Sequence, residues 1–471
     1  MSEKLFFKTA DELSQLISSK QVSPVQVVEE HINRIQVLEP KLNSYITILA
    51  DSALKQAKKH EAEIISGVYR GPLHGVPVAL KDIFYVAGVP NTYGSKINKD
   101  FIPQFNSTVV NKFVDAGAVL MGKLNLHQFA FGPTGENHHY GDMHNPWDVD
   151  AYAGGSSGGS GSAVAAGEAT IAMGSDTGGS IRIPSALCGI VGLKPTFGWV
   201  SKYGVNPLAW SMDHVGPMVR TVKDAGLVLN AIAGYDQRDL CSVNLPVPDF
   251  TAGLVDDINE IRVGVPKEYF EFPVHPQVKS SVDNAVIQLE KLGAHIIDVD
   301  WPIFRYAFDI STVLLIAEAS AGLSKLVMEK GHEFQTGTRL RVEGGMFYTA
   351  NDYLKAQRAR HLFVDKTREL MKTVDVLVGP MIPSGAPKIG QTEVDLGDEK
   401  QGIIPTFTQY SRAFNINGFP AMTVPCGFTD FNMPIGLQIA GRPWEEQTVL
   451  KVGHAFERAT DWHIKRPPEF R

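Results

Sequence analysis

Short apolar runs separated by helical stretches constrain the fold of this chain more than any other feature of its sequence. The runs cover residues 76–80, 119–121, 261–265, 374–378, 421–424 and 435–439. Helical patterns, such as the one around residues 445–458, lie between or after them, with glycine and proline as punctuation. This alternation predicts an α/β protein whose β-sheet is covered by helices.

The chain of 471 residues is long enough for one large domain or two ordinary ones. No linker clearly divides it, and no repeat of roughly 20–50 residues is present. We therefore expect a single domain over residues 1–471, in which residues 1–65 form helices that pack on the α/β core. Thr9 with Glu12, and Ser23 with Pro24, form capping patterns that predict the beginnings of two of these helices.

Composition and charge indicate the partners and the cellular compartment to expect. Its 44 basic and 51 acidic residues give a net charge of −7, which offers no electrostatic reason to expect a nucleic-acid partner. The N-terminus has no signal-peptide pattern, and the apolar residues 313–317 end at Glu318, far short of a membrane span. Cys188, Cys241 and Cys426 are odd in number and far apart, which is typical of a reducing compartment. We expect a cytoplasmic protein with no membrane partner.

Two glycine- and serine-rich clusters, residues 154–162 and 174–180, flank a stretch of small apolar residues at 163–166. The first cluster, taken alone, has the composition of a flexible linker. Its position argues against that interpretation, because the small-residue stretch suits a buried helix, and glycine-rich loops on both sides of it cost backbone entropy. Such a cost is expected where backbone N–H groups converge on a substrate.

Known nucleotide-binding motifs do not fit these clusters. The glycine register matches neither a dinucleotide fingerprint nor a phosphate-binding loop, so we expect no cofactor. Residues 154–158 match the nucleophile elbow centred on Ser156, which would make that serine the nucleophile. The elbow requires a strand directly before it, whereas residues 145–148 indicate a turn.

The histidines do not predict a metal centre. Residues 332–336 resemble the helix of a zinc protease but end in threonine instead of histidine. His138, His139 and His144 lie near Glu136 without a known ligand spacing. We therefore expect no bound metal.

Several motifs together resemble the amidase signature family. Ser156 lies in Gly-Gly-Ser-Ser-Gly-Gly-Ser, Ser180 lies in Asp-Thr-Gly-Gly-Ser-Ile-Arg-Ile-Pro, and Lys81 follows Val-Pro-Val-Ala-Leu. The motifs at 189–196 and 417–420 also fit, and the resemblance covers nearly the whole chain. It implies a large, mixed, twisted β-sheet covered by α-helices on both faces, with residues 71–220 as the signature core.

The resemblance also implies a catalytic triad of two serines and a lysine. Ser180 would be the nucleophile, Lys81 the base, and Ser156, after a cis peptide bond, the relay between them. A serine hydroxyl needs a base, and lysine can serve only when it is neutral, a form that burial favours. Asp82, next along the strand, would point to the opposite face and need not pair with Lys81.

Further site residues follow from the same resemblance. The oxyanion hole would be formed by the backbone N–H groups of Thr177, Gly178, Gly179 and Ser180. Substrate contacts are expected from Ala130, Phe131, Ser156 and Arg360. Asp176 and Arg182 are expected to tie down the loop and not to catalyse.

The substrate is less constrained than the reaction. Residues 355–360 resemble the A subunit of the tRNA-dependent glutamine amidotransferase, a glutaminase, with Arg360 where that subunit binds the glutamine carboxylate. Residues 326–330 and 407–410 depart from it, and the second stretch lacks the acidic residue that holds the glutamine amine. We therefore expect a stand-alone amidase acting on a small amide, aryl amide or carbamate. The aromatic residues considered for an apolar pocket are Phe129, Phe131, Phe347 and Tyr348.

Two alternatives remain. The chain could be the glutaminase A subunit, or a catalytically inactive binding or scaffold subunit that keeps the fold. The three intact residues Lys81, Ser156 and Ser180 argue against the inactive subunit. Whether the chain forms a homodimer is left open.

Overall fold

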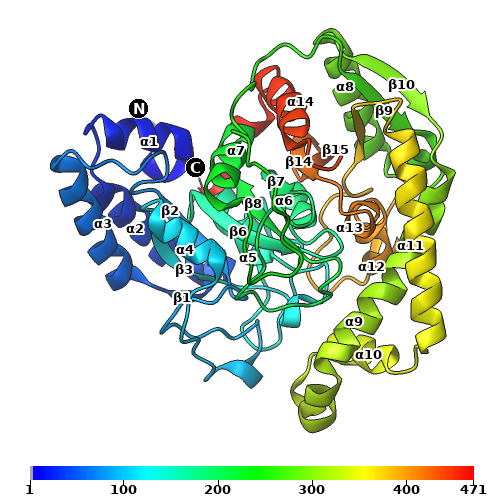
Figure 1. Ribbon diagram of the computed structural model, residues 1–471, viewed down its shortest axis with the longest axis horizontal. Coiled ribbons are helices and arrows are strands. Elements are labelled where there is room, and N and C mark those ends of the chain that lie inside the picture. Colours follow the sequence, from blue (N-terminus) through cyan, green and yellow to red (C-terminus); the bar gives the residue numbers. More distant parts are fainter. Residues whose placement is uncertain (1–3, 471) are drawn as a thin grey trace.

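One mixed β-sheet runs through the molecule from the N-terminal helices to the opposite end of the molecule (Figure 1). The computed structural model describes residues 4–470, and within them eleven strands form this sheet. Their order is β1 (Tyr45–Ile48), β3 (Val119–Leu124), β2 (Pro77–Lys81), β6 (Ile171–Asp176), β8 (His214–Val219), β7 (Val191–Lys194), β14 (Ala421–Phe428), β15 (Pro434–Gly441), β11 (Val376–Pro380), β9 (Arg262–Pro266) and β10 (His295–Val299). Each apolar run identified in the sequence overlaps one of these strands, which confirms the predicted α/β class.

The direction of the strands brings the carboxyl ends of β2 and β6 together. β2 is parallel to β3 on one side and to β6 on the other, with Leu80 level with Met173. The strands from β6 to β11 are antiparallel, and β11, β9 and β10 are again parallel. Because β2 and β6 run in the same direction, Lys81 at the end of β2 lies beside Ser175 at the end of β6.

Helices cover both faces of the sheet. Successive side chains along β2 and β6 point to opposite faces and pack against different sets of helices. Val78 and Leu80 join one apolar cluster with residues of α1 (Ala10–Ser18), α4 (Thr108–Asp115) and α7 (Val222–Ile232). Ala79 and Ala172 join another on the opposite face, with residues of α2 (Pro24–Leu42), α3 (Ala50–Ile65) and α5 (Gly158–Ala166). Lys81 has the same parity as Ala79, so its side chain leaves the strand toward α5.

The N-terminal segment is mostly helical, with one strand among the helices. Both predicted capping boxes are present, at Thr9 for α1 and at Ser23 for α2, where Pro24 is the first helical residue. Residues 45–48 form β1 instead of helix, at the edge of the sheet beside β3. This strand was missed because its four residues are too few to show an alternating pattern.

Three helices form the end of the molecule opposite the N-terminal helices. α9 (Ala307–Lys330), α10 (Thr336–Gly345) and α11 (Ala350–Leu370) pack together far from α1–α3 (Figure 1). The remaining α-helices are α6 (Arg182–Cys188), α8 (Pro276–Lys291), α12 (Ile403–Thr408), α13 (Ala413–Ile416) and α14 (Glu446–Arg458). Two small hairpins lie outside the main sheet: β4 (His144–Asn145) with β5 (Asp148–Tyr152), and β12 (Glu393–Asp395) with β13 (Lys400–Gly402).

The segment Pro302–Glu333, which contains α9, is long and apolar enough to cross a membrane by length and composition alone. Half of its most apolar window is buried inside the fold, and core helices of soluble proteins also satisfy this criterion. Glu318 within α9 is buried and accepts hydrogen bonds from Ser211. The expected absence of a membrane partner therefore stays a prediction.

Candidate active site

Lys81 is fully buried and is surrounded by serine hydroxyls. Its ammonium nitrogen Nζ lies 2.7 Å from Ser156 Oγ, 2.9 Å from Ser157 Oγ and 2.9 Å from Ser175 Oγ. Burial lowers the pKa of Lys81 to about 7, and the negative charges of Asp176 and Asp213 oppose this shift only in part. A lysine in this setting is neutral in a large fraction of molecules near neutral pH.

The neighbouring carboxylate does not neutralise Lys81. Asp82 points to the opposite face of the sheet, where one carboxylate oxygen lies 2.6 Å from Lys123 Nζ and the other accepts hydrogen bonds from Thr92. The expectation that Asp82 need not pair with Lys81 is confirmed. Within residues 4–470, Lys81 forms no ion pair, so desolvation dominates its pKa.

Ser156 lies between β5 and α5, deep beneath the surface. The peptide bond from Gly155 to Ser156 is cis, as the family resemblance implies. A side chain at position 155 would meet the backbone, because a Cβ atom there would lie 2.7 Å from the Gly132 carbonyl oxygen. The carbonyl of Ser156 accepts a hydrogen bond from His127 N at 3.1 Å. The backbone thus holds the Ser156 hydroxyl against Lys81.

The nucleophile-elbow alternative can now be compared with the structure. The expected absence of a strand before Ser156 is wrong, because β5 ends at Tyr152, only a few residues earlier. This strand was missed because it belongs to a small separate hairpin with β4 and carries little apolar pattern. Ser156 is nevertheless fully buried and does not line the pocket that Ser180 reaches.

Ser180 lies in the loop between β6 and α6, and the Asp176 carboxylate organises this loop. Asp176 accepts hydrogen bonds from Gly179 N at 2.7 Å and from Ile181 N at 3.2 Å, and it forms a buried ion pair with Arg182 at 2.9 Å. Burial alone would raise the pKa of Asp176, but Arg182 outweighs it and holds that pKa below its usual range. As predicted, Asp176 and Arg182 tie the loop down.

Contacts of Ser180 itself link the two glycine-rich loops. Its carbonyl accepts a hydrogen bond from Ser157 N at 3.3 Å, and its side chain faces a pocket. No hydrogen bond joins the hydroxyls of Ser156 and Ser180 within the described residues. The structure therefore brings Lys81, Ser156 and Ser180 into one locality, with a close contact between the first two.

The predicted oxyanion-hole residues form one turn, but their amides are not equivalent. The Gly179 amide already donates to Asp176, whereas those of Thr177, Gly178 and Ser180 have no acceptor within residues 4–470. Gly179 has a φ of +123°, which only glycine adopts readily, and a Cβ atom there would lie 2.5 Å from Ser411 Oγ. The free N–H groups of the other three residues can therefore face a substrate carbonyl oxygen.

A pocket opens onto Ser180. Its lining residues are Ala130, Phe131, Gly132, Pro133, Thr177, Gly178, Ser180, Ile183, Leu208, Leu315, Arg341, Ile404, Thr408 and Arg412. Ala130 and Phe131 thus lie where the sequence predicted substrate contacts. Two helices from the end of the molecule opposite α1–α3, α9 and α10, contribute Leu315 and Arg341 to the wall.

Arg360 does not line this pocket. Its guanidinium donates hydrogen bonds to the Ile416 carbonyl at 2.7 Å and to the carbonyl and hydroxyl of Ser211 at 2.8 and 3.0 Å. Three of the four aromatic residues considered for the pocket also lie elsewhere. Phe129 stacks on Phe334 in the core, the Phe347 side chain is 84% exposed, and Tyr348 is not among the lining residues.

Two arginines that the sequence analysis missed line the pocket: Arg341 and Arg412. They are far apart in the chain, on α10 and just before α13, and neither lies in a recognisable motif. Burial lowers the pKa of each to about 10. Nothing in a single sequence would distinguish them from ordinary surface arginines.

A group of possible metal ligands lies far from the triad. His60, Glu63 and His74 are the only set of three such residues found together in the described part of the chain. Their ligand atoms are joined by mutual hydrogen bonds of 3.1–3.3 Å, and Arg70 binds Glu63 at 2.6 Å. This network accounts for the cluster without a cation. His139, by contrast, accepts a hydrogen bond from Lys96 N.

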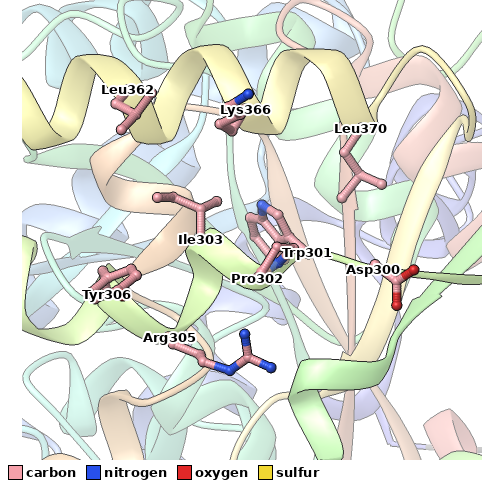
Figure 2. Close-up of a pocket in the computed structure, with 9 residues that line it drawn as sticks. All are labelled: Asp300, Trp301, Pro302, Ile303, Arg305, Tyr306, Leu362, Lys366 and Leu370. Atoms are coloured by element: carbon pink, nitrogen blue, oxygen red, sulfur yellow. The ribbon is translucent and has the colours of Figure 1, made fainter.

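A second hollow lies between η5 (Pro302–Tyr306) and α11 (Figure 2). Figure 2 shows Leu362, Lys366 and Leu370 on α11 facing Ile303 and Trp301 on the other side. Among its described lining residues there is no serine, cysteine or histidine. The hollow at Ser180 is therefore the better candidate for amide chemistry.

Comparisons with known proteins agree with this geometry. Residues 26–450 match the family described as Amidase. The chain is 40% identical to the A subunit of the glutamyl-tRNA(Gln) amidotransferase of Carboxydothermus hydrogenoformans, over 98% of this chain and 99% of that protein. Its fold is similar to that of a protein from a vestigial complex related to the origins of an s-triazine catabolic enzyme, with a TM-score of 0.92, 32% identity and coverage of 96% of this chain and 98% of the other.

A bacterial aryl acylamidase is also similar in structure, with a TM-score of 0.89 and 29% identity over 97% of this chain and 98% of the other. The mixed sheet covered by helices on both faces is the fold that the resemblance implied. The chain therefore belongs to the amidase signature family and is an amidohydrolase that acts on linear amides.

Proposed function

We propose that this protein hydrolyses a carboxamide through an acyl-enzyme on Ser180, with Lys81 as the base and Ser156 as the proton relay. The contact that carries the proposal is the 2.7 Å separation between Lys81 Nζ and Ser156 Oγ in a buried setting without a carboxylate on the lysine. A lysine whose pKa is about 7 can accept a proton at neutral pH, which an ordinary ammonium group cannot do.

The proposed reaction moves protons along the relay in both directions. Neutral Lys81 takes the proton of the Ser156 hydroxyl as Ser156 takes that of Ser180, and Ser180 Oγ attacks the substrate carbonyl. The free amides of Thr177, Gly178 and Ser180 stabilise the oxyanion. Ser156 then protonates the departing nitrogen and recovers a proton from Lys81, so the C–N bond breaks, the acyl group stays on Ser180 and Lys81 is neutral again. Water attacks the acyl-enzyme by the same relay and restores the free enzyme.

A glutaminase A subunit is the second candidate. The 40% identity over nearly the full length of an amidotransferase A subunit supports this candidate better than it supports a stand-alone amidase for apolar amides. One feature of the pocket argues against glutamine. Thr408 lines the pocket in the stretch where that subunit has its acidic residue, and no carboxylate is among the described lining residues. The ammonium group of glutamine would lack an ionic partner there.

A fluorophosphonate probe and peptide mapping test the nucleophile. We expect labelling at Ser180, no turnover by Ser180→Ala, and slow residual labelling at Ser180 in Ser156→Ala, which loses several orders of magnitude in amide turnover. Labelling at Ser156 would instead favour the elbow mechanism and contradict the proposed relay.

Ammonia release separates the two candidates. Glutamine and glutaramate, the monoamide of glutaric acid, differ only in the α-amino group. We expect the chain expressed alone to prefer glutaramate, because the pocket offers no partner for the ammonium. Efficient hydrolysis of glutamine that increases with a co-purifying partner and charged tRNA would establish the glutaminase candidate. Carbamates belong in the same screen, because the relay suits them equally.

We also infer a cytoplasmic location from composition and from Cys188, Cys241 and Cys426, which are all free thiols. Cell fractionation with an antibody against the protein tests this inference.

A further inference from the structure

We propose that the substrate carries, besides its amide, a negatively charged group such as a carboxylate, and that Arg341 and Arg412 bind this group. The inference rests on the proposed function, because it concerns the pocket that opens onto Ser180. The corresponding substrate class is the monoamides of short dicarboxylic acids and other amides with an anionic end.

Arg412 lies directly beside the turn that holds the nucleophile. Its Nε atom would be 3.9 Å from a Cβ atom built on Gly178, so it lies next to the predicted oxyanion hole. The guanidinium donates to the hydroxyls of Ser311 and Thr312 and lies over the Phe308 ring, 4.4 Å from its centre. The side chain is buried, and Nε has no hydrogen-bond acceptor within the described residues. All of these neighbours are uncharged.

Arg341 enters the same pocket from α10. Its guanidinium lies 4.7 Å from the centre of the Phe131 ring and donates one hydrogen bond to the Phe131 carbonyl. Its Nε is likewise buried without an acceptor in the described part of the chain. Glu136 is the acidic residue that favours the charged form of Arg341, but the two are not within ion-pair distance. The Glu136 carboxylate instead accepts hydrogen bonds from Tyr152 at 2.8 Å and Thr134 at 3.0 Å.

The pocket therefore has two positive charges and no negative charge among its described lining residues. The two guanidinium groups repel each other, which adds to the effect of burial in lowering the pKa of Arg412. Buried cations without a partner are costly, and the remaining carboxylates near the site are already occupied. Asp176 binds Arg182, and Asp213 accepts from Thr177 Oγ1 at 2.6 Å. An anionic substrate would relieve this imbalance.

Carboxylate is the group that suits this arrangement. Guanidinium forms short, charge-assisted and often paired hydrogen bonds with carboxylate oxygens, and the free Nε–H groups supply suitable donors. An uncharged acyl or aryl chain would leave both cations unpaired.

The test compares glutaramate with pentanamide, which has the same amide and chain length but a methyl group in place of the carboxylate. We expect kcat/KM to be about 10- to 100-fold higher for glutaramate, the range of a charge-assisted contact. Glutarate should inhibit competitively, and pentanoate should inhibit much more weakly. Equal or better hydrolysis of pentanamide by the wild-type enzyme would overturn the inference.

Variants assign the preference to the two arginines. In Arg341→Met and Arg412→Met, the ratio of kcat/KM between glutaramate and pentanamide should fall about tenfold each. Arg412→Lys keeps the charge and should retain part of the ratio. Arg339→Met is the matched control, because Arg339 also lies on α10 but pairs with Glu343 at the surface. An unchanged ratio in both pocket variants would overturn the inference.

Labelling of Ser180 by a fluorophosphonate distinguishes a failure of the anionic-substrate inference from misfolding of a variant and from a failure of the proposed function. A variant that still labels has kept its fold, so its ratio is meaningful. If Ser180 labels in the wild-type protein but pentanamide is preferred, only the anionic substrate is wrong. If Ser180 does not label and no amide is cleaved, the proposed function itself fails.

Discussion

The catalytic floor of the pocket (Lys81, Ser156, Ser180 and the loop 176–182) differs from the pocket wall (Leu315, Arg341, Ile404, Thr408 and Arg412). The floor lies at the ends of two adjacent parallel strands, and its charged groups have named partners: three serines on Lys81, and Arg182 with backbone amides on Asp176. The wall comes from α9, α10, α12 and the segment before α13, and its two cations lack carboxylate partners among residues 4–470.

This difference between floor and wall indicates that the floor carries out the reaction and the wall selects the substrate. The floor is complete without a ligand, because its charges and donors satisfy each other, apart from the amides that face the pocket. The wall is incomplete without a ligand, because two cations remain to be matched. Preorganised groups of the first kind determine the chemistry, whereas groups of the second kind determine which molecule undergoes it. The same floor can therefore serve amidases with different substrates.

The largest effect should come from removing the base of the floor. Lys81→Ala should lower kcat/KM for amides by about a thousandfold or more, because general-base catalysis and protonation of the leaving nitrogen both depend on the relay. Esters with good leaving groups should lose far less, since their leaving oxygen needs no proton. Lys81→Arg should not restore amide turnover, because guanidinium stays charged. Steady-state kinetics on matched amide and ester substrates measure this, and retained amide activity in Lys81→Ala would refute the relay.

The next effect concerns how the floor is held together. Asp176→Asn leaves Arg182 buried without its ion pair and should reduce the free energy of unfolding by about 3–5 kcal/mol in urea titrations. Because the pKa of Asp176 is lowered in the folded state, its contribution is present above the carboxyl pKa of the unfolded chain and is lost as the pH falls further. Asp375→Asn, in a partly exposed cluster with Arg262 and Arg442, should cost less. Equal losses would contradict the structural role given to Asp176.

The pH dependence of kcat/KM should show a limb near pH 7. Catalysis needs neutral Lys81, whose pKa burial lowers to about 7, so activity should fall tenfold for each pH unit below that value. Because this pKa lies below that of an unfolded lysine, the unfolded chain binds more protons above pH 7, and stability from this group rises with pH up to about 10.4. Burial keeps the pKa of the nearby His127 well below its usual range, so that histidine cannot produce the limb. A profile flat from about pH 6 to 8 would contradict the assignment.

Much of the floor could be predicted from the sequence because its residues lie in dense local motifs. The glycine-rich turn at 176–182 and the strand that ends at Lys81 carry their chemistry within a few residues, and their recognition needs no tertiary information. Six of the eleven strands of the sheet were predicted by their apolar runs for the same reason. β1 and β5 were missed because a short edge strand has little to bury and so shows little pattern.

The wall could not be predicted, because it is created by packing between distant elements. Arg341 and Arg412 meet only when α10 and the segment before α13 fold over the end of the sheet, and arginines on amphipathic helices are usually solvated. Arg360 is the opposite case. Its motif suggested a role in substrate binding, but Ser211 and Ile416 satisfy its donors in the folded chain. Motif resemblance identifies a residue but does not show where its side chain points.

The smallest predicted effect distinguishes two phenylalanines that the sequence treated alike. Phe131 lines the pocket, is only 4% exposed and supports the Arg341 guanidinium on its ring. Phe131→Ala should raise KM for the preferred amide about tenfold, because it removes both a wall contact and the support of a cation. Phe347 is 84% exposed and lies outside the pocket, so Phe347→Ala should change KM less than about twofold. Measuring KM and kcat for both variants on one substrate decides the matter. Similar changes in the two variants would mean that α10 and the segment after it close over the substrate differently, and the wall described here would need revision.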